Sequence, residues 1–195
     1  RQFSLAPRVF STRVGGLFLL LPLRARLDLD TVLAGCKFPG TTMIPAAYAV
    51  RAALVLKLLG KARRSHVMDL LFDEGIALAV GLNAVPKTTF MAQYSSRLGR
   101  KEIVRLLGAW IAQLRTEHLI DGSSFNLDFH SISYFGEDPV VEKHYVPRRS
   151  QRRKAVLVFL AQDATGQVFC YANTDLRKGE EADEVLRFVT FWEQR

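Results

Sequence analysis

The hydrophobic period of the chain changes near Gly122, from a helical period to alternation. From about Ser11 to Ile120, apolar residues recur at the spacing of amphipathic helices. After Gly122, the runs SFNLDFHSI, KAVLVFLAQD and VFCYANTDL indicate strands, and KGEEADEVLRFVTFWEQR is helical again. The sequence therefore predicts a helical region over residues 1–121 and a β-β-β-α unit over 122–195, in an α+β or α/β chain.

The helical region divides at turn and cap residues. A first helix starts at Ser11 or Thr12 and runs towards Leu23, and Pro45 suits the first turn of the next. Its expected apolar face is Ala46, Val50, Ala53, Leu54, Leu58 and Leu59. Ser65 is placed to cap a helix over HVMDLLFDEGIALAVGL. Helices over KTTFMAQYSSRL and RKEIVRLLGAWIAQLRTEHL complete the region.

The segment 13–26, RVGGLFLLLPLRAR, has the basic flanks and apolar middle of a signal peptide. Its apolar run, Leu17 to Leu23, is shorter than the roughly 20 residues that span a bilayer. Arg24 and Arg26 follow where a small-residue cleavage site belongs. We therefore expect a core helix here and no membrane association, with a targeting segment as the alternative.

Charge and cysteine content restrict the class of partner. The 195-residue chain carries a formal charge of +8, which favours polyanions such as nucleic acid or anionic lipid. Two cysteines far apart, Cys36 and Cys170, form no metal or disulfide pattern, and are expected to be buried free thiols in a reducing cytoplasm. Because the chain starts at Arg1 without Met and stops at Arg195 within a predicted helix, we expect a fragment of a longer protein.

Asp128 stands inside an alternating strand pattern, where Asp is rare. Residues two apart share a strand face, so Asn126, Asp128 and His130 point together while Leu127 and Phe129 point into the core. A carboxylate on a rigid strand suits a hard cation such as Mg²⁺. The alternative is a polar face of an edge strand that simply meets water.

Two basic clusters indicate contact with phosphates. The loop PRRSQRRK is the densest, and its cations are Arg148, Arg149, Arg152, Arg153 and Lys154. The second cluster is Lys57, Lys61, Arg63 and Arg64. The alternative interpretation is that each cluster is an ordinary solvated surface that binds no partner.

The segment GLNAVPKTTFMAQYSSRLGRK is compatible with the second half of a helix-turn-helix. Lys87, Thr88 and Thr89 would then start the helix that meets a DNA groove. The same residue types are common helix caps and surface residues. No Walker-type or dinucleotide-binding glycine pattern occurs, so we expect no nucleotide cofactor.

Three long runs resemble bacterial insertion-sequence transposases of the Asp-Asp-Glu type. They are GLNAVPKTTFMAQYSSR, NLDFHSISYFGEDPVVEKHYV and KAVLVFLAQDATGQVFCYANTDLRKGEEADEVLRF. The resemblance extends from roughly Arg8 to the end. It implies a helical DNA-binding region followed by the first part of a ribonuclease-H-like catalytic domain.

On this resemblance, Asp128 corresponds to the first catalytic and metal-binding acid of the triad. The family's second Asp and its Glu lie further downstream than this chain reaches, so Mg²⁺ or Mn²⁺ is expected only with the complete triad, and the fragment itself should be inactive. In such enzymes two metal ions activate the attacking oxygen and stabilise the leaving one. The expected partners are DNA (element ends and target) and further copies of the full-length protein, in a cytoplasmic, nucleoid-associated setting.

Other acidic residues do not replace the missing triad members. Asp163 suits a turn, Asp175 is not assigned a role, and Glu180 and Glu181 suit a helix N-terminus. Glu137 and Asp138 are expected in a solvated loop. A metal-dependent hydrolase using His130 and His144 lacks HxH or HExxH spacing.

A non-catalytic DNA-binding remnant of a decayed mobile element remains the rival interpretation. Its positive charge and its possible helix-turn-helix would allow DNA binding without a catalytic triad. The expected truncation also predicts an unpaired sheet edge beside the first strand, because a ribonuclease-H-like sheet continues there.

Overall fold

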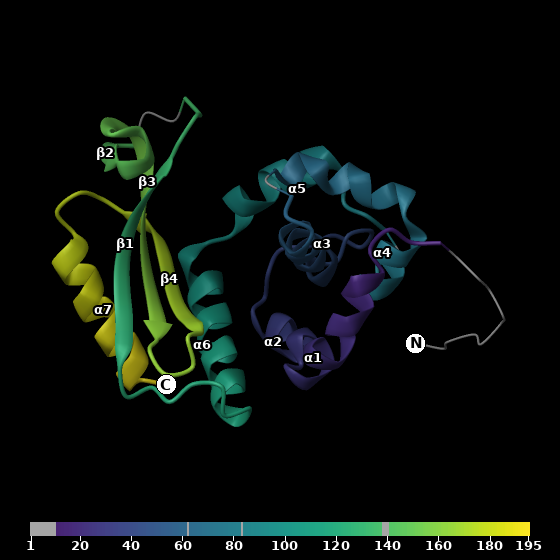
Figure 1. Cartoon of the computed structure of the whole chain (residues 1–195), viewed down its shortest axis with the longest axis horizontal. Coiled ribbons are helices and arrows are strands. Elements are labelled where there is room, and N and C mark those ends of the chain that lie inside the picture. Colours follow the sequence, from purple (N-terminus) through teal and green to yellow (C-terminus); the bar gives the residue numbers. More distant parts are fainter. Residues whose placement is uncertain (1–10, 62, 83, 138–140) are drawn as a thin grey trace. The chain divides into compact units, whose positions relative to one another are not determined.

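The computed structural model describes residues 11–61, 63–82, 84–137 and 141–195. Two compact units, Arg1–Leu106 and Leu107–Arg195, divide the chain, and each is treated by itself (Figure 1). The division falls inside the helix α6 (Arg100–Thr116), earlier than Gly122. The second half of α6 belongs with the sheet, because Ile111 and Leu114 are buried and Trp110 donates a hydrogen bond from Nε1 to the Phe169 carbonyl at 3.3 Å.

All the regular elements among the described residues of the first unit are helices. Its elements before α6 are η1 (Gly15–Leu20), α1 (Leu21–Arg26), α2 (Leu29–Gly35), α3 (Ala46–Leu58), η2 (Arg64–Phe72), α4 (Glu74–Val80), α5 (Thr88–Tyr94) and η3 (Ser95–Arg97), where η marks a 3₁₀ helix. Its core gathers apolar side chains from α3, η2, α4 and α5: Ala49, Ala52, Val55, Leu56, Val67, Leu70, Ile76, Leu82, Met91 and Tyr94.

The predicted buried face of α3 is wrong. Leu54 and Leu58 are exposed, and the buried positions are Ala49, Arg51, Ala52, Val55 and Leu56. The helix is apolar on almost every side, so hydrophobic periodicity has little power to choose the buried face. Arg51 is accommodated because it pairs with Asp30 and donates to the Gly81 carbonyl.

The predicted single helix over residues 66–82 is interrupted at Asp73. The Asp73 carboxylate accepts hydrogen bonds from the N–H groups of Gly75 at 2.9 Å and Ile76 at 3.3 Å, and so caps α4. Thr12 Oγ1 and the Arg13 N–H also donate to it. The cap lies at Asp73 rather than Ser65 because this carboxylate satisfies the free N–H groups of the first turn.

The segment 13–26 is helical but does not form a core helix. It divides into the short helices η1 and α1, and none of their residues is buried. Leu19, Leu20, Leu21 and Leu23 are exposed. Among the described residues, no helix has the length and apolar character needed to cross a membrane.

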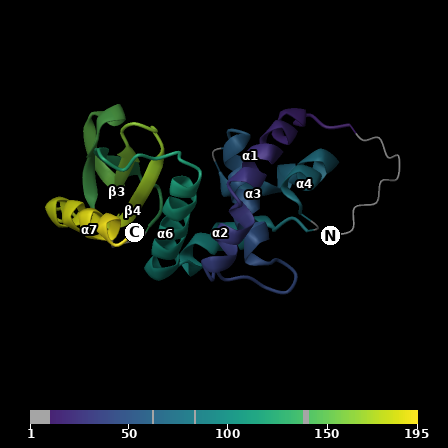
Figure 2. The same ribbon diagram turned by 90° about the horizontal axis from the view of Figure 1, so that it is seen from below.

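The second unit combines the end of α6 with an antiparallel sheet and a terminal helix (Figures 1 and 2). Its elements are β1 (Phe125–Ser133), β2 (Lys143–Val146), η4 (Pro147–Arg149), β3 (Gln151–Asp163), β4 (Phe169–Leu176) and α7 (Glu181–Glu193). The strands predicted over KAVLVFLAQD and VFCYANTDL are confirmed as the antiparallel hairpin of β3 and β4, and the predicted first strand is confirmed as β1. The chain is therefore of the mixed helix and antiparallel-sheet class, α+β.

The strand β3 is central to the sheet. Between residues 157 and 162 it pairs both with β1 and with β4, so these two strands lie on opposite sides of it. β2 pairs with residues 151–154 of β3, within the segment that the sequence predicted to be a loop. In the part of the chain that the structure describes, β1 pairs only with β3 and is an edge strand.

The helix α7 covers one face of the sheet. The Phe188 ring contacts Phe125 of β1, Phe159 of β3 and Tyr171 of β4, with centroids 5.1, 6.0 and 5.4 Å apart. The apolar residues of α7 alone would predict a buried stripe of Val185, Phe188, Val189 and Trp192. Of these Phe188 is buried, and the other buried side chains of the helix are Glu184 and Phe191. Glu184 lies on the buried side of the helix because its carboxylate accepts hydrogen bonds from Tyr171 and Arg187. A charged residue is normally expected on the exposed side, so the sequence pattern did not predict this burial.

Candidate functional site

Asp128 lies in the middle of the edge strand β1, on the face opposite α7. Phe129 stands opposite Phe159 in the register and packs on it towards α7, so Asp128, opposite Leu160, projects from the other face. Its side chain is exposed, and no described residue forms a hydrogen bond or ion pair with it. An exposed carboxylate on a paired strand is held at a fixed position while remaining available to a ligand.

Two polar neighbours share the face of Asp128. Asn126 donates from Nδ2 to Gln162 Oε1 at 3.4 Å, across the β1–β3 pair. His130 is exposed on the other side of Asp128. The expected core position of Leu127 is wrong, since this side chain is 42% exposed beside the open edge of the strand. Ile132 is exposed as well.

The donor set around Asp128 is too small to hold a metal ion. Among the described residues no group of three or more His, Cys, Asp and Glu side chains gathers at one place. Mg²⁺ prefers several oxygen ligands, and Asp128 supplies a single carboxylate beside an imidazole. These residues alone therefore do not support a metal-dependent reaction.

The histidines and remaining acids do not complete a site either. His144 lies on β2, where its Nε2 is 3.7 Å from Glu142 Oε2. Glu137 is exposed, as expected of a loop, and Asp138 lies outside the described residues. The carboxylates of Glu180 and Glu181 accept hydrogen bonds from the N–H groups of Arg177 and Gly179, so both serve the start of α7.

Two buried carboxylates were missed by the sequence interpretation. Asp163 is fully buried, and its Oδ1 accepts from the Asp121 N–H at 2.9 Å and the Gly122 N–H at 3.5 Å. It therefore fixes the backbone that leads into β1, and the turn role assigned to it is incomplete. Glu184 is also fully buried. Its position four residues before Phe188, on the buried stripe, was the available signal.

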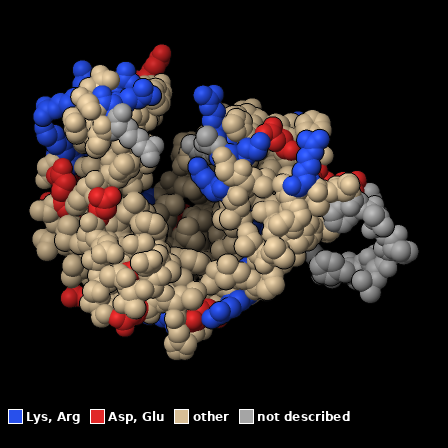
Figure 3. Space-filling model, in the orientation of Figure 1, with Lys and Arg blue, Asp and Glu red and all other residues tan. Residues whose placement is uncertain are grey.

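The basic loop is a short strand hairpin. Lys143, His144 and Tyr145 of β2 stand opposite Lys154, Arg153 and Arg152 of β3. Arg149, Arg152 and Arg153 are exposed, and Lys154 is half-buried. Arg148 lies in the connecting turn η4. Figure 3 shows the Lys and Arg side chains gathered over this hairpin.

The hairpin offers cations on both of its faces. Because side chains alternate along a strand, Arg152 and Arg153 point to opposite faces. Tyr145 is 56% exposed and stands directly opposite Arg152, so an aromatic ring accompanies one of the cations. Aromatic and basic side chains together suit phosphates and unstacked bases.

The start of α5 carries the other proposed DNA contacts. Lys87 is the N-cap residue and is exposed, as is Thr89. The Thr88 hydroxyl donates to the Ser65 carbonyl at 3.3 Å, which ties this end of α5 to η2. The buried side of α5 is formed by Met91 and Tyr94, so its first turn presents Lys87 and Thr89 to solvent.

The second basic cluster lines a groove along α3. Val50, Ala53, Leu54 and Leu56 form its apolar part, and Lys57, Lys61 and Arg63 its basic part. Lys61 Nζ donates to Asp69 Oδ2 at 2.9 Å, which neutralises one of these cations. Lys57 and Arg63 are exposed. This groove belongs to the first unit alone.

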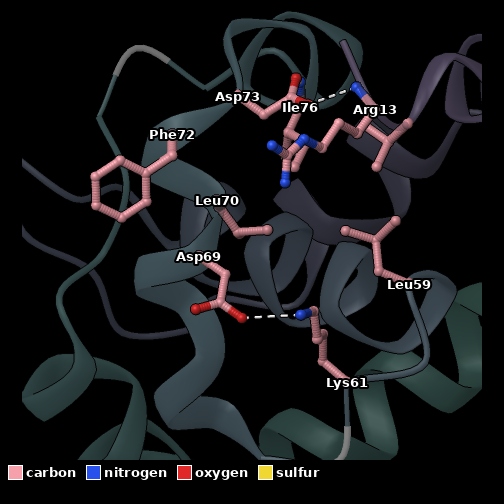
Figure 4. A pocket seen from close by; sticks show the side chains of 9 residues that line it. Arg13, Leu59, Lys61, Asp69, Leu70, Phe72, Asp73 and Ile76 are labelled. Carbon is pink, nitrogen blue, oxygen red and sulfur yellow. Dashed lines mark hydrogen bonds and ion pairs between the residues drawn. The ribbon is translucent and has the colours of Figure 1, made fainter.

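A neighbouring cavity of about 550 Å³ contains both Lys61 and Asp69 (Figure 4). Its lining also includes Arg13, Leu59, Leu70, Phe72, Asp73 and Ile76. Both carboxylates are engaged, Asp69 by Lys61 and Asp73 by the α4 cap. Hydrogen bonding from Thr12 and from the Arg13 N–H holds the pKa of Asp73 below its usual value. The cavity therefore lacks a carboxylate poised for acid–base chemistry.

The cysteines are buried free thiols, as predicted. Burial raises the pKa of Cys170 to about 11 and also raises that of Cys36. A thiol reacts as the thiolate, so neither is a nucleophile near neutral pH.

Comparison of the chain with protein-family models, with curated proteins and with solved structures finds no match in any of the three.

Proposed function

We propose that this chain is the N-terminal part of a transposase of the Asp-Asp-Glu type, with Asp128 as the first of its catalytic acids. The observation that supports the proposal is the order of elements in the second unit. The strands β1, β3 and β4 pair antiparallel to one another in that order, the helix α7 follows them, and the exposed Asp128 lies at the middle of β1. A ribonuclease-H-like domain begins with this order of elements, according to the family resemblance described above.

The open edge of β1 supports the same proposal. In a ribonuclease-H-like sheet a further strand lies beside the first, and that strand brings the second acid near Asp128. Here β1 has no partner on that side among the described residues. The metal ions, Mg²⁺ or Mn²⁺, would bind only when the second Asp and the Glu join Asp128, and would then activate the attacking oxygen.

DNA is the proposed partner of both units. Arg149, Arg152 and Arg153 on the β2–β3 hairpin, with Lys154 and Arg148, would neutralise backbone phosphates. Lys87, Thr89 and the first turn of α5 would approach a groove, with Thr88 positioned by its bond to Ser65. The full-length protein would associate with itself on element ends, in the cytoplasm on the nucleoid.

A second candidate function is binding without catalysis, as in a remnant of a decayed mobile element. The observation that favours it is the absence of acidic partners around Asp128 in the described part of the chain. DNA binding fits both candidates, so it does not separate them.

Reading the coding DNA beyond Arg195 separates them. The transposase proposal predicts an open frame that encodes an Asp at the end of a strand and a Glu on a later helix. A stop codon or a frameshift shortly after Arg195 would overturn it and favour the DNA-binding remnant.

A further inference from the structure

The cavity of about 550 Å³ in the first unit is bounded by four segments of the chain (Figure 4). These are the residues just before η1, the end of α3, η2 and the start of α4, and Arg13, Lys61, Leu70 and Ile76 are one lining residue from each, in that order. Pockets that hold small molecules in proteins usually measure about 300–1,000 Å³. The cavity is therefore large enough for a small organic ligand.

The inner wall of the cavity is apolar. Leu70 and Ile76 are 1% and 4% exposed and form part of the hydrophobic core, and Val14 and Leu59 are partly buried against the same core. These side chains form no hydrogen bonds, so contact with them favours an apolar group over water. The part of a ligand that lies against this wall should therefore be apolar.

The two carboxylates of the lining are already bound to other groups of the protein. Asp73 accepts hydrogen bonds from the Thr12 hydroxyl and from three backbone N–H groups. Two of these N–H groups belong to the start of α4, whose positive end offsets the charge of the carboxylate. Asp69 accepts a hydrogen bond of 2.9 Å from the Lys61 ammonium. The negative charge of each carboxylate is therefore compensated within the protein.

The guanidinium of Arg13 is a cation of the lining that has no such partner. This side chain forms no hydrogen bond or ion pair with any residue that the structure describes. In Figure 4 it extends from the segment before η1 towards Leu70. Lys61 uses one of its three N–H donors on Asp69. Because a guanidinium and a carboxylate form two parallel charge-assisted hydrogen bonds, these donors favour an anionic group with two acceptor oxygens.

An aromatic side chain stands at the rim of the cavity. Phe72 lines the cavity at the end of η2 and is 89% exposed. Figure 4 shows its ring apart from the other labelled side chains. An exposed ring contributes little packing energy to the folded unit, and it gains apolar contact when another ring stacks against it. A flat aromatic group is therefore the apolar body that both the rim and the inner wall favour.

We propose that this cavity binds a small aromatic carboxylate. The carboxylate lies on the Arg13 guanidinium with Lys61 as a further donor, and the aromatic ring lies between the apolar wall and Phe72. A nucleotide also combines an anion with a flat ring, but the apolar wall leaves the polar edge of its base without hydrogen-bonding partners. The site shares no residue with the proposed catalytic acid or the proposed DNA contacts, so its failure would leave the proposed function standing.

Isothermal titration calorimetry of the chain with 2-naphthoate tests the binding, and a single saturable site is expected. The alcohol 2-naphthylmethanol keeps the ring without the charge, and acetate keeps the charge without the ring. Each should bind at least about tenfold more weakly than 2-naphthoate, because each loses one of the two contacts. Adenosine monophosphate should also bind more weakly. Equal affinity for 2-naphthoate and either partial ligand, or tighter binding of the monophosphate, would contradict the assigned ligand class.

Variants of the lining locate the site. Arg13→Gln keeps the backbone N–H bond to the α4 cap and should weaken the binding of 2-naphthoate about tenfold. Phe72→Ala should weaken it roughly threefold. Asp69→Asn removes the charge that engages Lys61 and should strengthen it.

The matched control is Arg63→Gln, which alters an exposed arginine outside the cavity and should leave the affinity unchanged. All four substituted side chains are exposed, so circular dichroism should show an unchanged fold. Absence of binding by the native chain, or an affinity that Arg13→Gln leaves unchanged, would overturn the proposal.

Discussion

The hydroxyl of Tyr171, on β4, donates a hydrogen bond of 2.9 Å to Oε1 of the fully buried Glu184 on α7. The other oxygen of Glu184 accepts from Arg187 at 3.2 Å. The bond therefore links the helix to the sheet through a carboxylate that has no access to water. A buried charged group of this kind depends on each of its partners.

Removing the Tyr171 hydroxyl should destabilise the second unit. Tyr171→Phe leaves one oxygen of Glu184 without this donor, and we expect the free energy of unfolding to fall by about 1–3 kcal/mol. Urea denaturation followed by tryptophan fluorescence measures it, because Trp110 and Trp192 both lie in this unit. Tyr145→Phe, at an exposed position, is the matched control and should change nothing. Equal stability of the two variants would contradict the role of the bond.

The Asp73 cap should stabilise α4 in a pH-dependent manner. Asp73→Ala should cost about 1 kcal/mol, the usual effect of losing an N-cap. Because hydrogen bonding lowers the pKa of Asp73 in the folded chain, its contribution is present above the unfolded value of 3.8 and is lost as the pH falls through the folded value. Hydrogen exchange of the α4 amides in the variant and the parent chain measures this. Asp69→Ala, which removes an exposed ion pair, should have a smaller effect.

The native thiols should resist modification. With its pKa raised to about 11 by burial, Cys170 should react with a disulfide reagent far more slowly than a free thiol at pH 7, and Cys36 should behave in the same way. Both should react rapidly in urea. Ala92→Cys, at an exposed position on α5, gives the control rate. Rapid reaction of two thiols in the folded native chain would show that their burial is incorrectly assigned.

The β2–β3 hairpin should account for part of the salt dependence of DNA binding. Arg152→Gln and Arg153→Gln should each reduce the slope of log K against log salt by about 0.9, the effect of one phosphate contact. Fluorescence anisotropy with a labelled duplex over a range of salt concentrations measures the slope. Lys101→Gln, an exposed cation on α6, is the control and should leave the slope unchanged. Unchanged slopes in both arginine variants would exclude the hairpin from the interface.

Most elements of the second unit could be predicted from the sequence, because each is specified by its own local sequence pattern. β1, the β3–β4 hairpin and α7 each have a clear period and clear turn residues, so their existence needed no tertiary information. β2 was missed because it has four residues, of which Lys143 and His144 are polar, and it is a strand only through its pairing with β3.

Non-local contacts explain the other differences. The partners of Asp163 are backbone groups of Asp121 and Gly122, far away in the sequence, and no local pattern announces them. The break at Asp73 depends in part on Thr12, which lies on a different segment. Asp128 was singled out by its residue type in a strand, whereas its exposure at an open edge follows from the order of the strands in the sheet.

Metal-dependent DNA nicking tests the central claim most directly. The protein would be produced from Arg1 through the downstream reading frame and supplied with DNA and Mg²⁺. We predict nicking that requires the metal, is lost in Asp128→Asn, and persists in His130→Asn, which alters the neighbouring side chain on the same face. Nicking that survives Asp128→Asn, or its absence in an extended protein that binds DNA, would contradict the assignment of Asp128 as a catalytic acid.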